Sequence, residues 1–191
     1  QKSHFEAYAL NHLMKLIAPD HALIQTHGDT QGAACTTLLA KEFIDNDDDL
    51  IIANADQFLD IDINDFIADA RAKASDGHII TFVSSHPKWS FVRLDSEGLV
   101  AEVAEKKPIS HNATAGVYYF KKGKYFVDGI QRMIRKNVRT NSEFYICPVF
   151  NELILEDKKI TIFPISREKM YGMGTPEELN TLLKSEVASR L

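Results

Sequence analysis

Short apolar runs and segments of helical spacing alternate along most of the chain. The clearest run, Leu50-Ile51-Ile52-Ala53-Asn54-Ala55, shows almost no alternation and predicts a strand buried on both faces. Further strands are predicted at 22–26, 78–84, 91–94, 99–104, 115–120 and 159–165. Helices are predicted over 3–17, 33–43, 63–74, 126–138 and 143–155, and Thr175-Pro176-Glu177-Glu178 predicts a further helix start.

The order of these elements predicts the class of the fold. Strands and helices alternate, which is typical of an α/β protein with a mostly parallel central sheet covered by helices. The turn Asp95-Ser96-Glu97-Gly98 joins two of the strands into an inserted β-hairpin. Ligands of open α/β sheets bind beyond the carboxyl ends of the strands, where Asp56 and the loops after residues 26 and 84 are expected.

Composition narrows the class of protein. The 191 residues are 45% hydrophobic and 26% charged, which is ordinary for one globular domain over 1–191 and excludes a disordered, fibrous or low-complexity chain. The net charge of −5 disfavours nucleic-acid binding, and no apolar run approaches the ~18 residues that a membrane span needs. Cys35 and Cys147 stand far apart, which excludes a disulfide framework or zinc knuckle and fits the cytoplasm.

Candidate chemistry begins where the 50–55 strand ends. The carboxylate of Asp56 is well placed there to hold Mg²⁺, a cation that prefers oxygen ligands and keeps phosphate oxygens as partners. The alternative interpretation of Asp56 is a turn or helix cap. A second acidic pattern, Asp60-Ile61-Asp62, matches the D-x-D metal motif of many glycosyltransferases, although Asp62 would also cap the helix that follows.

Two further segments contain residue types that suit a phosphorylated ligand. In Thr30-Gln31-Gly32-Ala33-Ala34, Gly32 lets a group approach the free N–H groups of a helix start, and Gln31 can both donate and accept, as base recognition requires. The alternative is a tight helix start packed on the sheet. Glu105-Lys106 can bind sugar hydroxyls and a phosphate, or form an exposed charged turn. Gly116 either admits a ligand close to its strand or marks a bulge.

Several segments, taken in order, form a joint pattern. They are Thr30-Gln31-Gly32-Ala33-Ala34, Asn54-Ala55-Asp56, His86-Pro87-Lys88-Trp89-Ser90, Glu105-Lys106-x-Pro108, residues 113–120, Glu143-Phe144-Tyr145 and Gly174-Thr175-Pro176-Glu177-Glu178-Leu179. Over nearly the whole chain this pattern resembles the nucleoside-diphosphate-sugar pyrophosphorylases, and most of all their bacterial branch linked to capsule and surface polysaccharide. The resemblance implies a Rossmann-like three-layer fold. It also implies nucleotidyl transfer from a nucleoside triphosphate to a sugar 1-phosphate, with Mg²⁺ as cofactor and release of pyrophosphate.

The resemblance implies roles for residues at the nucleotide end of the site. Gln31 and Gly32 would contact the base or the ribose. Asp56 would hold Mg²⁺ and is one expected catalytic residue. Glu143 and Tyr145 are expected close to the site, with either a structural or a direct role.

The resemblance also implies a sugar-binding end. Trp89 and Ser90 would line the sugar pocket, and Glu105 would bind sugar hydroxyls. Lys106 would bind the sugar phosphate and is the second expected catalytic residue. Gly116 would admit the sugar.

Two departures from the family pattern leave other functions open. The family's Gly-rich triphosphate loop would precede Gln1, so the chain is expected to lack its native first strand and this loop. Gly172 stands where the family often has an Asp that serves as second metal ligand. The alternatives are a regulatory module that binds nucleotide or sugar phosphate without catalysis, and a glycosyltransferase that uses Asp60 and Asp62. The base, the acceptor and the oligomeric state stay open, a homo-oligomer and an acceptor such as phosphocholine included.

Overall fold

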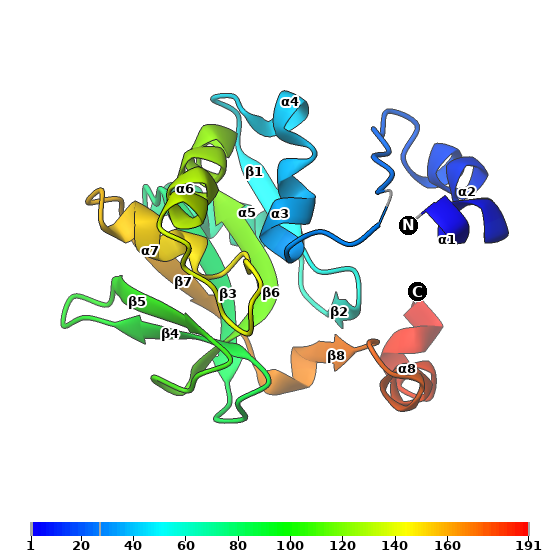
Figure 1. Ribbon diagram of the computed structural model, residues 1–191. Coiled ribbons are helices and arrows are strands. Elements are labelled where there is room, and N and C mark those ends of the chain that lie inside the picture. The colour runs from blue at the N-terminus through cyan, green and yellow to red at the C-terminus, as the bar shows by residue number, and fades with distance from the viewer. Residues whose placement is uncertain (1, 27, 191) are drawn as a thin grey trace.

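The computed structural model describes residues 2–26 and 28–190, with a six-stranded sheet at its centre (Figure 1). Its strands are β1 (Leu50–Ala53), β3 (Gly77–Val83), β4 (Ser90–Leu94), β5 (Val100–Glu105), β6 (Asn112–Phe120) and β7 (Ile160–Pro164). The order across the sheet is β5-β4-β6-β3-β7, and β1 also pairs with β6. The strand β3 pairs along one edge of β6. The other edge of β6 is shared by two strands: β4 pairs near Ala113, and β1 pairs over 117–120.

The α/β class and the hairpin are confirmed, but the prediction of a mostly parallel sheet is wrong for the described strands. Only β3 and β7 are parallel, whereas β6 runs antiparallel to β1, β3 and β4. Burial on both faces is also not confirmed for the apolar run 50–53, because only Ile52 is buried while Leu50 and Ile51 are half-buried and Ala53 is exposed. Such a run does not report the direction of the neighbouring strand. The predicted turn is present, with Asp95 Oδ1 accepting hydrogen bonds from the backbone N–H groups of Glu97 and Leu99.

Helices cover both faces of this sheet. On one face lie α3 (Ala33–Leu38), α6 (Gly123–Arg135) and α7 (Val149–Ile154), and on the other lies α5 (Ile63–Ala72), behind the sheet in Figure 1. Each face of the sheet has its own hydrophobic core, and alternate side chains of β6 belong to each. Tyr118 and Phe120 lie in the core under α3, α6 and α7, while Val117 and Tyr119 lie in the core with Phe66 of α5. The three-layer arrangement is therefore confirmed.

A second, small sheet brings the C-terminal part of the chain to the end of β1. The strands β2 (Gln57–Leu59) and β8 (Met170–Gly172), which the sequence did not predict, pair antiparallel, and Gln57 lies opposite Gly172. A 3₁₀ turn (Arg167–Lys169) precedes β8 and α8 (Pro176–Leu183) follows it. The predicted start of α8 is confirmed: the Thr175 hydroxyl accepts a hydrogen bond from Glu178 N at 3.2 Å, and Pro176 takes the first helical position.

The N-terminal elements differ from their predictions. The helix predicted over 3–17 is divided into α1 (Lys2–Ala7) and α2 (Leu10–Ile17) because Ala9 adopts a left-handed conformation with φ 48°. Figure 1 shows both helices apart from the central sheet. No strand forms at 22–26 within the described residues, because a short apolar run becomes a strand only where a neighbour pairs with it.

Two other predicted helices are shorter than expected. The helix predicted over 33–43 consists of α3 and α4 (Lys41–Ile44), and the one predicted over 143–155 begins at Val149. Pro148 immediately precedes that start, and proline favours a helix beginning because it cannot donate to an earlier turn. A 3₁₀ turn, Glu186–Arg190, follows α8. Within the described residues, no helix is long and apolar enough to cross a membrane.

Candidate active site

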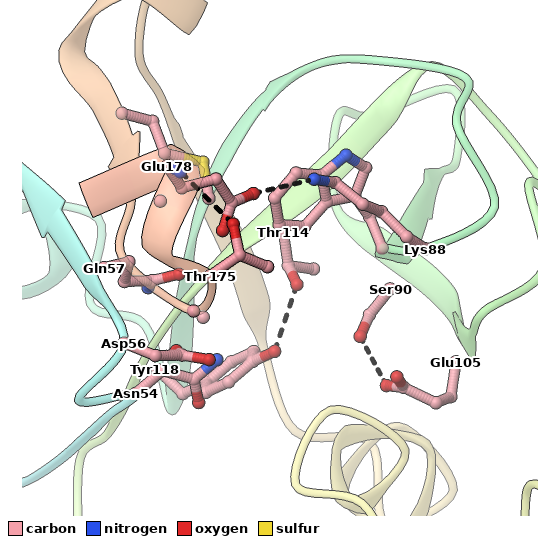
Figure 2. Close-up of a pocket in the computed structure, with 15 residues that line it drawn as sticks. Asn54, Asp56, Gln57, Lys88, Ser90, Glu105, Thr114, Tyr118, Thr175 and Glu178 are labelled. Carbon is pink, nitrogen blue, oxygen red and sulfur yellow. Dashed lines mark hydrogen bonds and ion pairs between the residues drawn. The ribbon is translucent and has the colours of Figure 1, made fainter. Parts of the chain in front are cut away.

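An open cavity of about 380 Å³ lies beyond the carboxyl end of β1. Its walls come from the loop after β1, from the 84–90 loop and the ends of β4 and β5, from β6, and from the segment that joins β8 to α8 (Figure 2). The lining residues are Asn54, Asp56, Gln57, Lys88, Trp89, Ser90, Glu105, Thr114, Gly116, Tyr118, Met170, Gly172, Gly174, Thr175 and Glu178. Five of the predicted site residues therefore lie around one cavity: Asp56, Trp89, Ser90, Glu105 and Gly116.

Asp56 lies three residues after the end of β1, at the strand end where the sequence predicts it. Its backbone carbonyl accepts a hydrogen bond from Met173 N at 2.7 Å, which ties the loop to the end of β8. A Cβ built on Gly174 would lie 3.4 Å from Asp56 Oδ2 and 3.6 Å from Glu178 Oε2. Two carboxylates from distant parts of the chain thus flank the same glycine.

Gly116 lets the loop after β1 approach β6. Its φ is +68°, and a Cβ there would lie 2.5 Å from Asn54 Nδ2 and 2.7 Å from Gln57 Nε2. The Gln57 amide donates to the carbonyl of Ala115, and Asn54 N donates to the carbonyl of Gly116 at 3.0 Å. The room left by the absent side chain is therefore filled by Asn54 and Gln57.

Glu105 and Ser90 form a hydrogen-bonded pair on the opposite wall. They are direct neighbours across β4 and β5, and the Ser90 hydroxyl donates to Glu105 Oε2. Burial raises the pKa of Glu105, while the Ser90 hydrogen bond and the nearby Lys106 charge oppose this rise. Behind this pair Tyr118 bonds to Thr114 at 3.0 Å, and burial raises the pKa of Tyr118 well above its usual range.

Trp89 gives the cavity an aromatic wall. Its ring meets Phe82 edge to face at 5.2 Å between centroids. The ammonium of Lys88 lies 4.4 Å from the centre of the Trp89 ring and 3.4 Å from Glu178 Oε1. This wall combines an apolar face with a positive charge, which suits a phosphorylated sugar.

Lys106 does not line the cavity. It lies in a left-handed turn (φ 53°), and its ammonium donates to the hydroxyl of Tyr145 at 2.7 Å. That hydrogen bond raises the pKa of Lys106, with the nearby charge of Glu143 adding to it. Tyr145 and Glu143 are thus neighbours of Lys106 and not of Asp56 in this arrangement.

Gln31 and Gly32 form a separate group with the segment before α7. Phe144 N donates to Gln31 O at 2.8 Å, and a Cβ on Gly32 would lie 2.5 Å from Phe144 O. The Gln31 side chain accepts a hydrogen bond from Arg139 Nη2 at 2.7 Å, and the Arg139 guanidinium stacks 4.1 Å from the centre of the Phe144 ring. The Phe144 backbone thus fills the space beside Gly32, and its carbonyl accepts a hydrogen bond from Ala34 N at 3.0 Å. This matches the alternative interpretation of a tightly packed helix start, while the exposed Gln31 side chain stays a candidate for base recognition.

Sequence reasoning missed several residues of these two groups. Asn54 and Gln57 flank Asp56 in the sequence, and that adjacency was the only signal for them. The sequence explains Thr175 and Glu178 as a helix start. Arg139 belongs with Arg132, Arg135 and Lys136 to a basic stripe at helical spacing, which predicts a solvated face. Lys88, Thr114 and Tyr118 lie inside motifs of the family pattern but carried no local signal of their own.

The acidic pair of the D-x-D pattern has a structural use. Asp62 Oδ1 accepts hydrogen bonds from the backbone and side-chain nitrogens of Asn64 at 2.8 and 3.0 Å, which caps α5. Asp60 N donates to Lys169 O at 2.8 Å, next to the β2–β8 pair. Neither residue lines the cavity, which disfavours the glycosyltransferase interpretation.

The comparisons with known proteins bear on the family and the fold. The family model described as "Nucleotidyl transferase" matches residues 7–165. A nucleoside-diphosphate-sugar pyrophosphorylase from Vibrio cholerae RC9 is 25% identical with a TM-score of 0.77, over 95% of this chain and 77% of that chain. A Bacillus anthracis protein described as a glucose-1-phosphate thymidylyltransferase, solved with sucrose, is 16% identical with a TM-score of 0.66, over 90% of this chain and 70% of that chain. No curated protein matches the sequence. Since the family model spans most of the sequence, the chain belongs to the nucleotidyl transferase family.

Proposed function

We propose that this protein transfers a nucleotidyl group from a nucleoside triphosphate to a sugar 1-phosphate and releases pyrophosphate. The observation that carries the proposal is that Asp56, the hydrogen-bonded pair of Glu105 and Ser90, and Trp89 all line one cavity. A carboxylate for a cation and a hydroxyl-binding pair in one cavity suit a ligand that is both a phosphate and a sugar. The family and the Vibrio cholerae relative support the same reaction class.

The sugar would occupy the wall formed by Glu105, Ser90 and Trp89. Glu105 keeps acceptor capacity for a sugar hydroxyl beyond its bond to Ser90, because a carboxylate has about four lone-pair positions. The indole face of Trp89 offers apolar area to the C–H face of a sugar ring. The Lys88 ammonium lies over the Trp89 indole ring and would bind a phosphate oxygen.

The nucleotide would lie toward Gln31. Its side-chain N–H groups suit a base edge, and Arg139 fixes its orientation. Lys106 follows Glu105 of the cavity wall in the sequence, and it would bind the sugar phosphate by leaving the Tyr145 hydroxyl. The cytoplasmic location and a surface-polysaccharide product stay predictions.

The residues present fit a magnesium ion. No group of three or more metal-ligating side chains occurs among the described residues, whereas Asp56 and Glu178 both flank Gly174. Mg²⁺ is commonly held by one or two carboxylates together with substrate phosphates, so two carboxylates at one site are a suitable ligand set. When bound, the ion would offset negative charge on the phosphate oxygens.

The chemistry asked of the protein is positioning. The sugar phosphate oxygen attacks the α-phosphorus in line, the bond from that phosphorus to the bridging oxygen breaks, and pyrophosphate leaves with the electron pair. Glu105, Ser90 and Trp89 hold the sugar so that its phosphate points toward Asp56, and Lys106 neutralises the attacking group. Orientation and charge together can supply most of such a rate enhancement.

The test is pyrophosphate release by the natural full-length protein with four nucleoside triphosphates, several sugar 1-phosphates and Mg²⁺. We expect turnover with at least one pair, and a loss of about 100-fold or more in Asp56→Asn. Asp60→Asn is the matched control and should retain activity. Ligand-induced thermal stabilisation without turnover would favour the regulatory module instead.

A further inference from the structure

The space beside Gly172 is filled by the carboxylate of another residue. A Cβ built on Gly172 would lie 2.9 Å from Glu178 Cδ and 3.0 Å from each of its two carboxylate oxygens. The backbone of Gly172 is not in the left-handed region, so conformational strain does not require glycine there. The glycine therefore serves to admit Glu178.

The fold fixes the position from which Glu178 reaches this space. Its backbone N–H is held by the Thr175 hydroxyl in the first turn of α8. Gly172 lies opposite Gln57 in the small sheet, and Met173 N is bonded to the carbonyl of Asp56. The two carboxylates consequently flank Gly174, with Asp56 Oδ2 at 3.4 Å and Glu178 Oε2 at 3.6 Å from its Cβ position, and both border the cavity in Figure 2.

A cationic group already lies at this carboxylate. The Lys88 ammonium is 3.4 Å from Glu178 Oε1, at a distance that a loose ion pair allows. Lys88 projects from a loop and its side chain is 46% exposed, so it can leave without disturbing the fold. The Glu178 carboxylate therefore already attracts a positive charge at this position.

We propose that Glu178 supplies the second carboxylate, opposite Asp56, for the divalent cation. The inference rests on the proposed function for the identity of the ion, and on the Gly172 space for the identity of the residue. It explains how the chain can retain two carboxylates although residue 172 has no side chain. Glu178 would act directly or through a cation-bound water, both of which suit Mg²⁺.

The test measures binding of Mn²⁺ alone to the natural full-length protein by electron paramagnetic resonance, without substrates. We expect Glu178→Gln and Asp56→Asn each to weaken binding by about tenfold or more. Glu177→Gln is the matched control, because this neighbouring glutamate is exposed and lies outside the cavity. Lys88→Met should tighten binding, since it removes the competing cation.

A double variant that moves the carboxylate from position 178 to position 172 completes the test. Gly172→Asp alone should weaken binding because its side chain would collide with Glu178, whereas Gly172→Asp combined with Glu178→Ala should restore Mn²⁺ affinity. Equal affinity in Glu178→Gln and Glu177→Gln would overturn the inference, as would undetectable Mn²⁺ binding to the unsubstituted protein. If Mn²⁺ binding depends on Glu178 but no pyrophosphate is released, the cation site stands and the proposed reaction fails.

Discussion

Ser90 donates a hydrogen bond to Glu105, its direct neighbour across β4 and β5, at the wall of the cavity. If this pair binds sugar hydroxyls, Glu105→Gln should lower kcat/KM by roughly 10- to 100-fold, the usual range for losing hydrogen bonds to a charged group. Pyrophosphate release at varied sugar phosphate concentration measures this. Glu102→Gln, on the exposed part of β5, is the control and should leave kcat/KM unchanged.

Although Glu105→Gln should lower activity, we expect it to raise the stability of the folded protein at neutral pH. Burial raises the pKa of Glu105, so the folded protein loses stability as the pH rises through this titration, above the ordinary value of 4.5. Glu105→Gln should remove that loss, which thermal unfolding from pH 4 to 8 would detect. A variant that lost activity and stability together would indicate a structural role instead.

A second pH dependence is expected from His78. Its ring is fully buried, stacks on Phe66 at 4.9 Å, and lies 2.6 Å from the Thr161 hydroxyl and 3.0 Å from Asp69 Oδ2. Burial lowers the pKa of His78 to about 4 from 6.5, with the charge of Asp69 opposing the shift. The neutral ring therefore contributes stability above pH 6.5 that is lost as the pH falls toward 4.

The expected size of this effect is about 2–3 kcal/mol between pH 6.5 and 4. His78→Gln should flatten the pH dependence of the free energy of unfolding over this window, even if the variant is less stable throughout. Denaturant unfolding at several pH values measures the slope. His111→Gln is a suitable control because His111 is exposed. An unchanged slope in His78→Gln would contradict the prediction.

Gly116→Ala should displace the loop that holds Asp56. The new methyl group would meet the amides of Asn54 and Gln57 at 2.5 and 2.7 Å on a residue with φ +68°, and we expect a cost of about 1–3 kcal/mol. Gly98→Ala separates strain from collision, because Gly98 also has a positive φ but no neighbour within 4 Å of its Cβ position. Both variants should lose stability, but only Gly116→Ala should weaken Mn²⁺ binding. Equal Mn²⁺ affinity in the two variants would show that the collision does not reach Asp56.

Arg139→Met should weaken nucleotide binding by about tenfold, since it frees the Gln31 amide that Arg139 now orients. Titration calorimetry with the preferred nucleotide gives the dissociation constant. Arg135→Met, at the exposed end of α6, provides the control. If both variants bind equally, Gln31 needs no orienting partner.

Much of the fold followed from local patterns. The strand before Asp56, the hairpin at 95–98 and the cap at Thr175 depend on neighbours within a few residues, and the sequence contains those neighbours. The small sheet did not follow, because β2 and β8 are three residues each and exist only through their mutual pairing. The prediction of parallel strands failed for the same reason. The direction of the strand beside β1 depends on how the chain leads back to β6, and not on the residues of β1.

In the candidate site, too, the residues with local sequence signals could be predicted and those that depend on distant partners could not. Asp56 and Glu105 could be placed at strand ends, where ligands of such sheets gather. Glu178 could not, because its capping role explained it fully until the structure placed its carboxylate beside Gly172. Arg139 escaped notice because its partner Gln31 is distant in sequence and only the fold brings them together.

The small β2–β8 sheet has a consequence for the order in which the protein is made. Residues 170–178 are synthesised after every strand of the central sheet, and they alone bring Gly174 and Glu178 to Asp56. Every strand of the central sheet therefore precedes, along the chain, the segment that forms this wall of the cavity. Synthesis that stops soon after Ile165 would give a chain that contains all six strands of the central sheet but only one of the two carboxylates, that of Asp56.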